Sequence, residues 1–244
     1  MHAAELEVGA AELRERFEAA FWCEDIGTYA LALDGAKRPC RVRSSNAGHA
    51  LFCDIAGEEH ARRVAETLMS PGSFSGWGVR TVASSEARYN PISYHDGSVW
   101  PHDNALIGMG LGRYGHKDAL HRILTGMFEA AVFIDQYRLP ELFCGFVKRP
   151  GMGPTLYPVA CIPQAWASAT VLGLLGACLG IKFDVAGKTI RFHHPTLPEA
   201  INRLDLSGLR LGDATVDLRF RRYATDVSMN VLRREGNLEV IVSS

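Results

Sequence analysis

The chain of 244 residues lacks several features that would place it in a class at once. Its formal net charge is only -1, and its lysines and arginines are scattered, so no nucleic-acid partner is expected. Its six cysteines include no C-x-x-C motif and follow no regular spacing, which argues against a zinc site. No basic-then-apolar signal opens the sequence. These absences predict a reduced, cytoplasmic protein without a cofactor or a metal.

A long apolar segment that could cross a membrane is also lacking. The most apolar run, residues 165–181, is interrupted by Ser168, Thr170 and three glycines. A membrane-spanning helix needs about 20 mostly apolar residues, so this run is better read as a buried helix. Hydrophobic residues make up 47% and charged residues 22%, which is typical of a soluble globular protein.

What the chain does have is helical periodicity in its first 180 residues. Apolar side chains recur every three to four positions in several segments, with Pro and Gly at their ends. The predicted helices cover residues 10–21, 47–55, 58–69, 98–113, 116–136 and 158–180. Long irregular loops, 73–95 and 137–157, separate them. Loops of that length in a compact domain are usually functional.

The pattern changes after Gly180, where short alternating segments are separated by Gly, Pro and Asn turns. The predicted strands are 181–185, 189–193, 201–206, 215–221, 227–233 and 238–242. We therefore expect a helical domain at 1–180 and a β-rich module at 181–244. In the helical part, short apolar helices alternate with amphipathic ones, which is the arrangement of inner and outer helices in a helical toroid.

Residues 89–104 carry the strongest functional signal. They combine two Tyr, one Trp, two His, two Asp and two Asn, and they lead directly into an apolar helix. Aromatic faces beside carboxylates and amides suit a sugar ring, which stacks through its C–H face and hydrogen-bonds through its hydroxyls. The segment predicts a carbohydrate site at the start of a helix.

Three carboxylates could carry chemistry. Glu141 is flanked by Pro, Leu, Phe and Cys, and such surroundings suit a general base or acid, although it could equally pair with Arg138 or cap a helix. Asp96 could act in catalysis or merely form a turn before Gly97, and Asp103 could bind a ligand or satisfy helix N–H groups. His95 and His102 lack a third partner for a metal.

Four blocks in this order resemble the amylo-alpha-1,6-glucosidase family, the catalytic region of glycogen debranching enzymes. They are RSSNAGH at 43–49, NPISYHDGSVWPHDN at 90–104, LPELF at 139–143 and CIPQAW at 161–166. The resemblance runs from about residue 13 to 180. It implies a mainly α fold, an (α/α)6 toroid of the six-hairpin glycosidase type, followed here by the small β-rich module.

The resemblance also implies hydrolysis of α-glucosidic linkages, of the debranching type, by an inverting mechanism. Glu141 matches the family's loop glutamate and is the expected general base, with Asp96 as the second catalytic candidate. Inversion requires two carboxyl groups roughly 6.5–9.5 Å apart, with a water between them. The expected substrate-binding residues are Tyr94, His95, Trp100, His102, Asp103, Asn104, Gln164 and Trp166.

The chain departs from this family because its sequence predicts only about half of the helices of a toroid. The resemblance therefore implies a C-terminal half, whose expected partners are an oligosaccharide or small glycoside and the missing N-terminal half. Two other functions remain open. One is a non-catalytic carbohydrate-binding or assembly fragment, and the other is a lyase or epimerase in which His95 or Tyr94 acts as the base.

Overall fold

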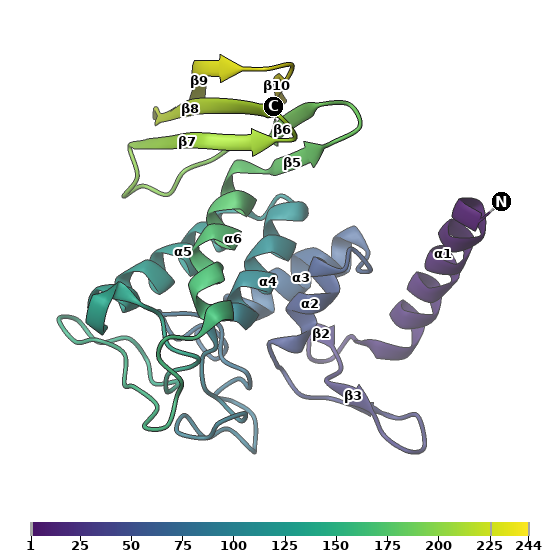
Figure 1. The fold of residues 1–244 in the computed structure, drawn as a ribbon. Helices are drawn as coiled ribbons and strands as arrows, with labels where there is room; N and C mark the ends of the chain where they lie inside the picture. The colour runs from purple at the N-terminus through teal and green to yellow at the C-terminus, as the bar shows by residue number, and fades with distance from the viewer. Residues whose placement is uncertain (1, 225, 244) are drawn as a thin grey trace. The chain divides into compact units, whose positions relative to one another are not determined.

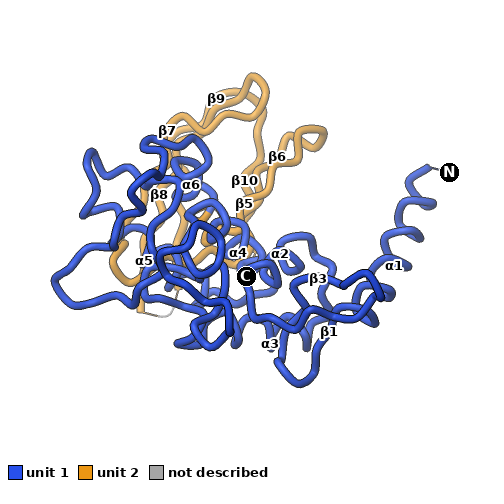
Figure 2. Tube along the Cα trace, turned by 90° about the horizontal axis from the view of Figure 1, so that it is seen from below, with its two compact units in different colours: residues 1–173 blue, residues 174–244 orange. Residues whose placement is uncertain are grey.

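Six α-helices and ten strands form the regular structure of residues 2–224 and 226–243, the part that this computed structural model describes (Figure 1). The chain divides into two units, Met1–Gly173 and Leu174–Ser244 (Figure 2). The helices are α1 (His2–Phe21), α2 (Asn46–Phe52), α3 (Glu58–Leu68), α4 (Pro101–Arg113), α5 (Lys117–Val132) and α6 (Ala165–Leu179). A short 3-10 turn, η1, follows at Asp135–Tyr137.

Helix α4 is the centre of the first unit, and it packs against both α2 and α5. It begins at Pro101, whose fixed φ suits the first helical position, after an extended Trp100. Leu51 of α2 and Ile107 and Leu111 of α4 are fully buried. A Cβ on Gly110 would lie 2.6 Å from the main-chain nitrogen of Phe52, so only glycine permits this close approach of α2 and α4.

Short strands lie where the periodicity of the sequence predicts no element. They form two small hairpins, made of β1 (Trp22–Cys23) with β2 (Thr28–Tyr29) and β3 (Ala32–Leu33) with β4 (Pro39–Cys40). Isolated bridges join other segments, among them Arg80 with Val99 and Val99 with Phe143. The long loops are therefore tied to one another through main-chain hydrogen bonds.

The second unit consists of two three-stranded sheets. One has the order β10 (Glu239–Ser243), β6 (Thr189–His193), β5 (Ile181–Asp184), and the other β7 (Arg203–Leu211), β8 (Ala214–Arg222), β9 (Val227–Glu235). Alternate residues of β8 are buried, as the period of two in a strand requires. The rings of Phe192 and Phe220, one from each sheet, lie 5.1 Å apart in a shared apolar core. All six strands lie at positions that the sequence predicts.

The expected mainly α fold, the C-terminal half of an (α/α)6 toroid, is wrong: the described residues form a mixed α and β structure. Helices cover less than half of residues 10–180. The expected helix at 158–180 begins only at Ala165, because Pro158 and Pro163 disfavour helical geometry in the residues before them. The expected helix at 47–55 ends at Phe52, and the loops contribute strands and bridges instead.

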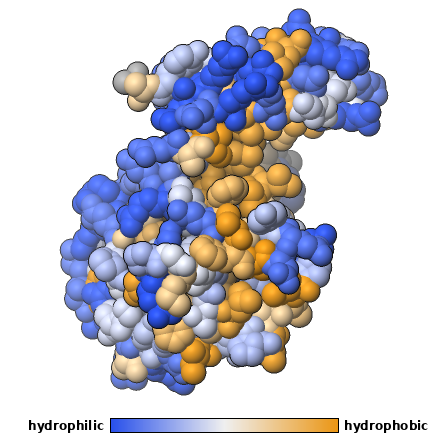
Figure 3. Space-filling view, turned by 90° about the vertical axis from the view of Figure 1, so that its left-hand side faces the viewer, coloured by the Kyte–Doolittle hydropathy of each residue, from blue (hydrophilic) through white to orange (hydrophobic). Residues whose placement is uncertain are grey.

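Within the described residues, no helix combines the length and the apolar character that crossing a membrane requires. The first unit nevertheless leaves several large apolar side chains exposed on α5 and α6, namely Phe128, Val132, Trp166 and Leu172. Apolar residues form a band on the face that Figure 3 draws.

Candidate active site

The site is assembled from two long loops that lie 40 to 60 residues apart in the sequence, as the separations of its bonded pairs show. Val99 and Phe143 exchange both main-chain hydrogen bonds, at 2.9 and 3.0 Å, and Phe143 also bridges to Leu156. This pairing places the segment before α4 beside the segment that contains Glu141. The aromatic and polar segment 89–104 and Glu141 therefore lie side by side.

A buried arginine joins the same loops through hydrogen bonds to main-chain carbonyls. The guanidinium of Arg80, whose side chain is 1% exposed, donates to the carbonyl of Gly145 at 2.6 Å and to the carbonyls of Pro71 and Gly72 at 3.2 and 3.0 Å. The hydroxyl of Tyr89 donates to the same Gly145 oxygen at 3.1 Å. Burial lowers the pKa of Arg80, and the neighbouring Tyr89 acts in the opposite direction.

Glu141 is held on both sides of its carboxylate. It is only 8% exposed. Its Oε1 accepts a hydrogen bond of 2.8 Å from the hydroxyl of Tyr94, and its Oε2 accepts one of 3.3 Å from the main-chain N–H of Cys161. The Glu141 carboxylate raises the pKa of Tyr94, chiefly through this hydrogen bond, so the phenol keeps its proton and donates it. Glu141 is therefore fixed in orientation.

Aromatic rings surround the Tyr94–Glu141 pair, and we call the surface that they form the aromatic wall: Tyr94, His95, Trp100, His102, Tyr157 and Trp166. The ring of Tyr94 meets Trp100 edge-on with centroids 4.8 Å apart, and it meets Tyr157 edge-on at 5.6 Å. The ring of His95 is parallel to that of Trp100 at 5.7 Å. Trp100 is 7% exposed, and its indole N–H donates to the Tyr94 carbonyl at 3.1 Å. These contacts keep the rings rigid, which a stacking surface for a sugar requires.

The first turn of α6 contributes the outer part of the aromatic wall. Trp166 is 45% exposed, stacks on His102 with centroids 4.4 Å apart, and lies 6.4 Å from the ring of Trp100. Gln164 precedes the helix, and its side-chain oxygen accepts the N–H of Ala165 at 3.0 Å. The structure thus brings Tyr94, His95, Trp100, His102 and Trp166 together, with Gln164 at the base of α6.

Two buried polar atoms in the first turn of α4 have no partner among the described residues. They are Nδ1 of His102 and Oδ2 of Asp103. Burial lowers the pKa of His102, while the charges of Asp103 and Glu141 both act to raise it, so the three groups are electrostatic neighbours. A buried atom without a partner is costly. A ligand hydroxyl could donate to Asp103 and accept from, or donate to, His102.

Two other predicted residues have mainly structural contacts. Asn104 is fully buried, and its amide accepts from the N–H of Val79 at 2.7 Å and donates to the carbonyls of Val79 and Trp100 at 3.1 and 3.0 Å. These bonds join α4 to the preceding loop, and the contact of Asn104 with substrate stays a prediction. Asp96 closes a turn through Ser93 Oγ, which lies 3.4 Å from its carboxylate. The catalytic role of Asp96 stays a prediction.

His49 is a site residue that the sequence analysis did not single out. Its Nε2 lies 2.6 Å from Oδ1 of Asp103, and it is contributed by α2. The pair orients the Asp103 carboxylate so that Oδ2 remains available. The only signal for His49 in the sequence is its place at the end of the RSSNAGH block, because its partner lies 54 residues further along.

The hydrogen bond that His49 donates to the Asp103 carboxylate raises the pKa of His49 above its ordinary value of 6.5, and burial opposes this shift. The pair therefore stabilises the fold below the pKa of an unfolded histidine, and this stabilisation is lost as the pH rises through the raised pKa. In an NMR titration we expect the pKa of His49 to fall in Asp103→Asn, where burial is left without its opposing carboxylate. Asp96→Asn, which does not contact His49, should leave it unchanged. An unaltered pKa in Asp103→Asn would contradict the pairing.

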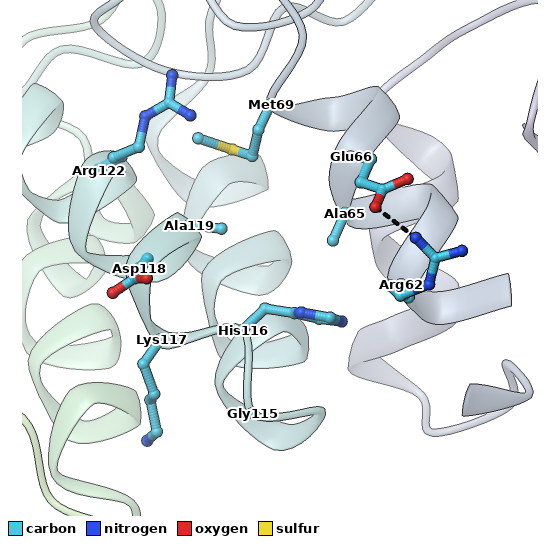
Figure 4. A pocket seen from close by; sticks show the side chains of 10 residues that line it. All are labelled: Arg62, Ala65, Glu66, Met69, Gly115, His116, Lys117, Asp118, Ala119 and Arg122. Atoms are coloured by element: carbon cyan, nitrogen blue, oxygen red, sulfur yellow. Dashed lines mark hydrogen bonds and ion pairs between the residues drawn. The ribbon is translucent and has the colours of Figure 1, made fainter. Parts of the chain in front are cut away.

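A separate pocket of about 420 Å3 opens between α3 and the start of α5 (Figure 4). Its lining residues carry charges of both signs. Arg62 pairs with Glu66 on α3, and Lys117, Asp118 and Arg122 lie on α5. None of its lining residues is Phe, Tyr or Trp. It lacks the stacking surface of the aromatic wall, so size alone does not make it the sugar site.

Comparison with known proteins agrees with a carbohydrate-active fold. Residues 1–141 match the profile of the family described as "Mannosylglycerate hydrolase MGH1-like glycoside hydrolase domain". No curated protein sequence matches significantly.

Solved structures of glycosidases are similar in fold. A sialidase covers 94% of this chain with a TM-score of 0.71 at 13% identity, and the GH78 family rhamnosidase of Bacillus sp. GL1 covers 95% with 0.63 at 16%. The GH63 mannosylglycerate hydrolase of Thermus thermophilus in complex with glucose covers 66% with 0.51 at 21%. The chain spans only 22% of the first two and 38% of the third. At these identities the likeness concerns the fold alone.

Proposed function

Because the chain belongs to the family of mannosylglycerate hydrolase MGH1-like glycoside hydrolase domains, we propose that it hydrolyses a glycosidic bond at the carboxylate of Glu141. The observation that carries this proposal is the fixed geometry of that carboxylate. It is nearly buried, held by Tyr94 and by the N–H of Cys161, and flanked by the aromatic wall. A general base needs such a fixed position and orientation, because it must accept a proton from one specifically placed water molecule.

In the proposed reaction Glu141 takes a proton from a water molecule, which attacks the anomeric carbon while a second carboxyl group protonates the leaving oxygen. The sugar ring stacks on the aromatic wall, and its hydroxyls bond to Asp103 Oδ2 and His102 Nδ1, the two buried atoms in the first turn of α4 that have no partner among the described residues. Asp96 is the proposed second carboxyl group. Its carboxylate accepts a long hydrogen bond of 3.4 Å from Ser93 Oγ, which a substrate group could replace.

The family found here is that of MGH1-like glycoside hydrolase domains, which supports a glycosidase in general and leaves the debranching assignment from the sequence undecided. We propose a neutral α-glucoside as the substrate class, with an α-1,6 branch as one case. Support comes from the RSSNAGH, LPELF and CIPQAW blocks and from the lack of a lysine or arginine among the residues that this proposal places against the sugar.

The direct test is hydrolysis of an aryl α-glucoside and of an oligosaccharide with one α-1,6 linkage, followed by proton NMR. We expect glucose to be released first as the β-anomer, because a single displacement inverts the anomeric carbon. Initial release of the α-anomer would contradict the inverting mechanism, and hydrolysis of β-glucosides alone would contradict the linkage.

A second function rests on the aromatic wall, whose rings are held in fixed contact with one another. Such a wall could bind a sugar without turnover. Binding of maltooligosaccharide, followed by calorimetry, with no product after prolonged incubation would identify this carbohydrate-binding function.

A further inference from the structure

Helix α1 stands apart from the rest of the first unit over most of its length (Figures 1 and 2). None of its residues from His2 to Phe21, all of them described, is buried. The contacts described for it lie in its C-terminal half. There Glu18 accepts hydrogen bonds from the hydroxyl of Tyr29 at 2.7 Å and the N–H of Gly57 at 2.6 Å, and it pairs with His60 at 2.5 Å. The helix is firmly anchored at one end and free at the other.

Helix α1 carries a regular apolar stripe along its length, from its free half into its attached end, and we call this stripe the α1 seam. Its residues are Ala3, Leu6, Ala10, Leu13, Phe17 and Ala20. The spacing alternates between three and four, which is the seam of a coiled coil. Leu6 is 64% and Leu13 52% exposed. A helix that is solvated on all sides has no reason to align its leucines in this way.

The α1 seam continues into an open apolar pocket. The pocket has a volume of about 290 Å3 and lies between α1 and α2. Phe17 belongs to both the seam and the pocket, and the opposite wall is formed by Ala47 and Ala50 of α2 and by Cys53, which directly follows α2. A helix laid along the seam would therefore also contact α2 at its far end. That second surface matters, because a coiled coil of less than three heptads is marginal by itself.

We propose that this surface binds a second copy of the same chain, with the two α1 helices paired antiparallel. Antiparallel pairing about the middle of the seam sets Ala10 against the partner's Leu13 and Leu6 against the partner's Phe17. The free half of each helix then enters the partner's pocket beside α2. The arrangement has two-fold symmetry, so it closes on two copies and leaves neither seam exposed.

The charges beside the α1 seam favour this direction. Glu7 and Arg14 occupy equivalent flanking positions two turns apart. In the antiparallel pair Glu7 lies beside the partner's Arg14, and Arg14 lies beside the partner's Glu7. In a parallel pair Arg14 would meet the partner's Gly9 instead, and both opposite-charge contacts would be lost. Arg14 also donates to the carbonyl of Asp54 in its own chain.

The first test is the molar mass of the whole chain in solution, measured by light scattering and sedimentation equilibrium at concentrations on the order of 100 µM. We expect a mass near twice the 26.7 kDa of one chain. Leu6→Glu and Leu13→Glu should each return the mass to that of one chain. Val8→Glu is the matched control, because Val8 is 59% exposed on α1 but lies outside the seam, and it should leave the dimer intact.

Circular dichroism checks that each variant stays folded, which is expected because both leucines are exposed. A monomeric wild type, or a dimer that survives Leu6→Glu and Leu13→Glu, would overturn the proposal.

The second test concerns direction. Glu7→Arg and Arg14→Glu, made singly, place like charges together and should each weaken dimerisation on the order of tenfold. The double variant restores both opposite-charge contacts and should regain most of the lost affinity. If the double variant lost as much free energy of dimerisation as the two single variants lose together, the antiparallel pairing would be excluded.

Discussion

Glu141→Gln is expected to reduce the turnover of a glycoside that the wild type hydrolyses by roughly a thousandfold. An amide cannot accept the proton of the attacking water. The amide oxygen can still accept from Tyr94 or from the N–H of Cys161, so the loops and the aromatic wall should keep their places. Initial rates measure the loss in turnover, and calorimetry with the same sugar should show binding that is little changed.

Glu129→Gln is the matched control for this variant. Glu129 pairs with Lys148 on the surface, where exposed ion pairs contribute little, so both turnover and stability should remain near normal. If Glu141→Gln itself retained near-normal turnover, Glu141 would not be the base. Asp96 would then be the next carboxylate to test.

Gly145→Ala is expected to destabilise the fold by about 3 kcal/mol or more. A Cβ at this position would lie 1.7 Å from the carbonyl oxygen of Gly97, far inside any contact distance. The backbone cannot move away without disturbing the Arg80 and Tyr89 hydrogen bonds to Gly145 and the neighbouring Val99–Phe143 pair. Urea unfolding monitored by tryptophan fluorescence should show the loss as a lower midpoint.

Gly35→Ala controls for the general effect of this substitution, because nothing lies within 4 Å of a Cβ there. It should change the free energy of unfolding by less than about 0.5 kcal/mol. Equal stability of Gly145→Ala and Gly35→Ala would mean that the two site loops are not in the tight contact described above.

The sequence predicted elements well where local periodicity decides them. The alternation of Ala214, Val216, Leu218 and Phe220 identifies β8 because those side chains share one face of a strand. The sequence failed where distant segments pair. Val99 and Phe143 show no local sign of their bridge, since a single paired residue has no period. The mainly α expectation failed for the same reason.

The candidate site shows the same division. An aromatic motif beside a helix start was readable from residues 89–104, and the structure brings most of its rings together. Asn104 could not be distinguished from its neighbours, because a polar residue in the first turn of a helix can face either a ligand or the main chain. Its hydrogen bonds to Val79, 25 residues earlier, are visible only in the structure. His49 was overlooked because Asp103 gives it a function from another helix.

The long sequence separations within the site affect the order in which the chain can fold. Tyr94 and Glu141 are 47 residues apart, and Arg80 and Gly145 are 65 apart. Closing such loops costs entropy before any contact repays it, whereas α4 and α5, joined by a short turn, can form early. A partly folded chain would therefore show nearly full helical circular dichroism and still lack an assembled site. Helical content alone is a poor measure of the active fraction of a preparation.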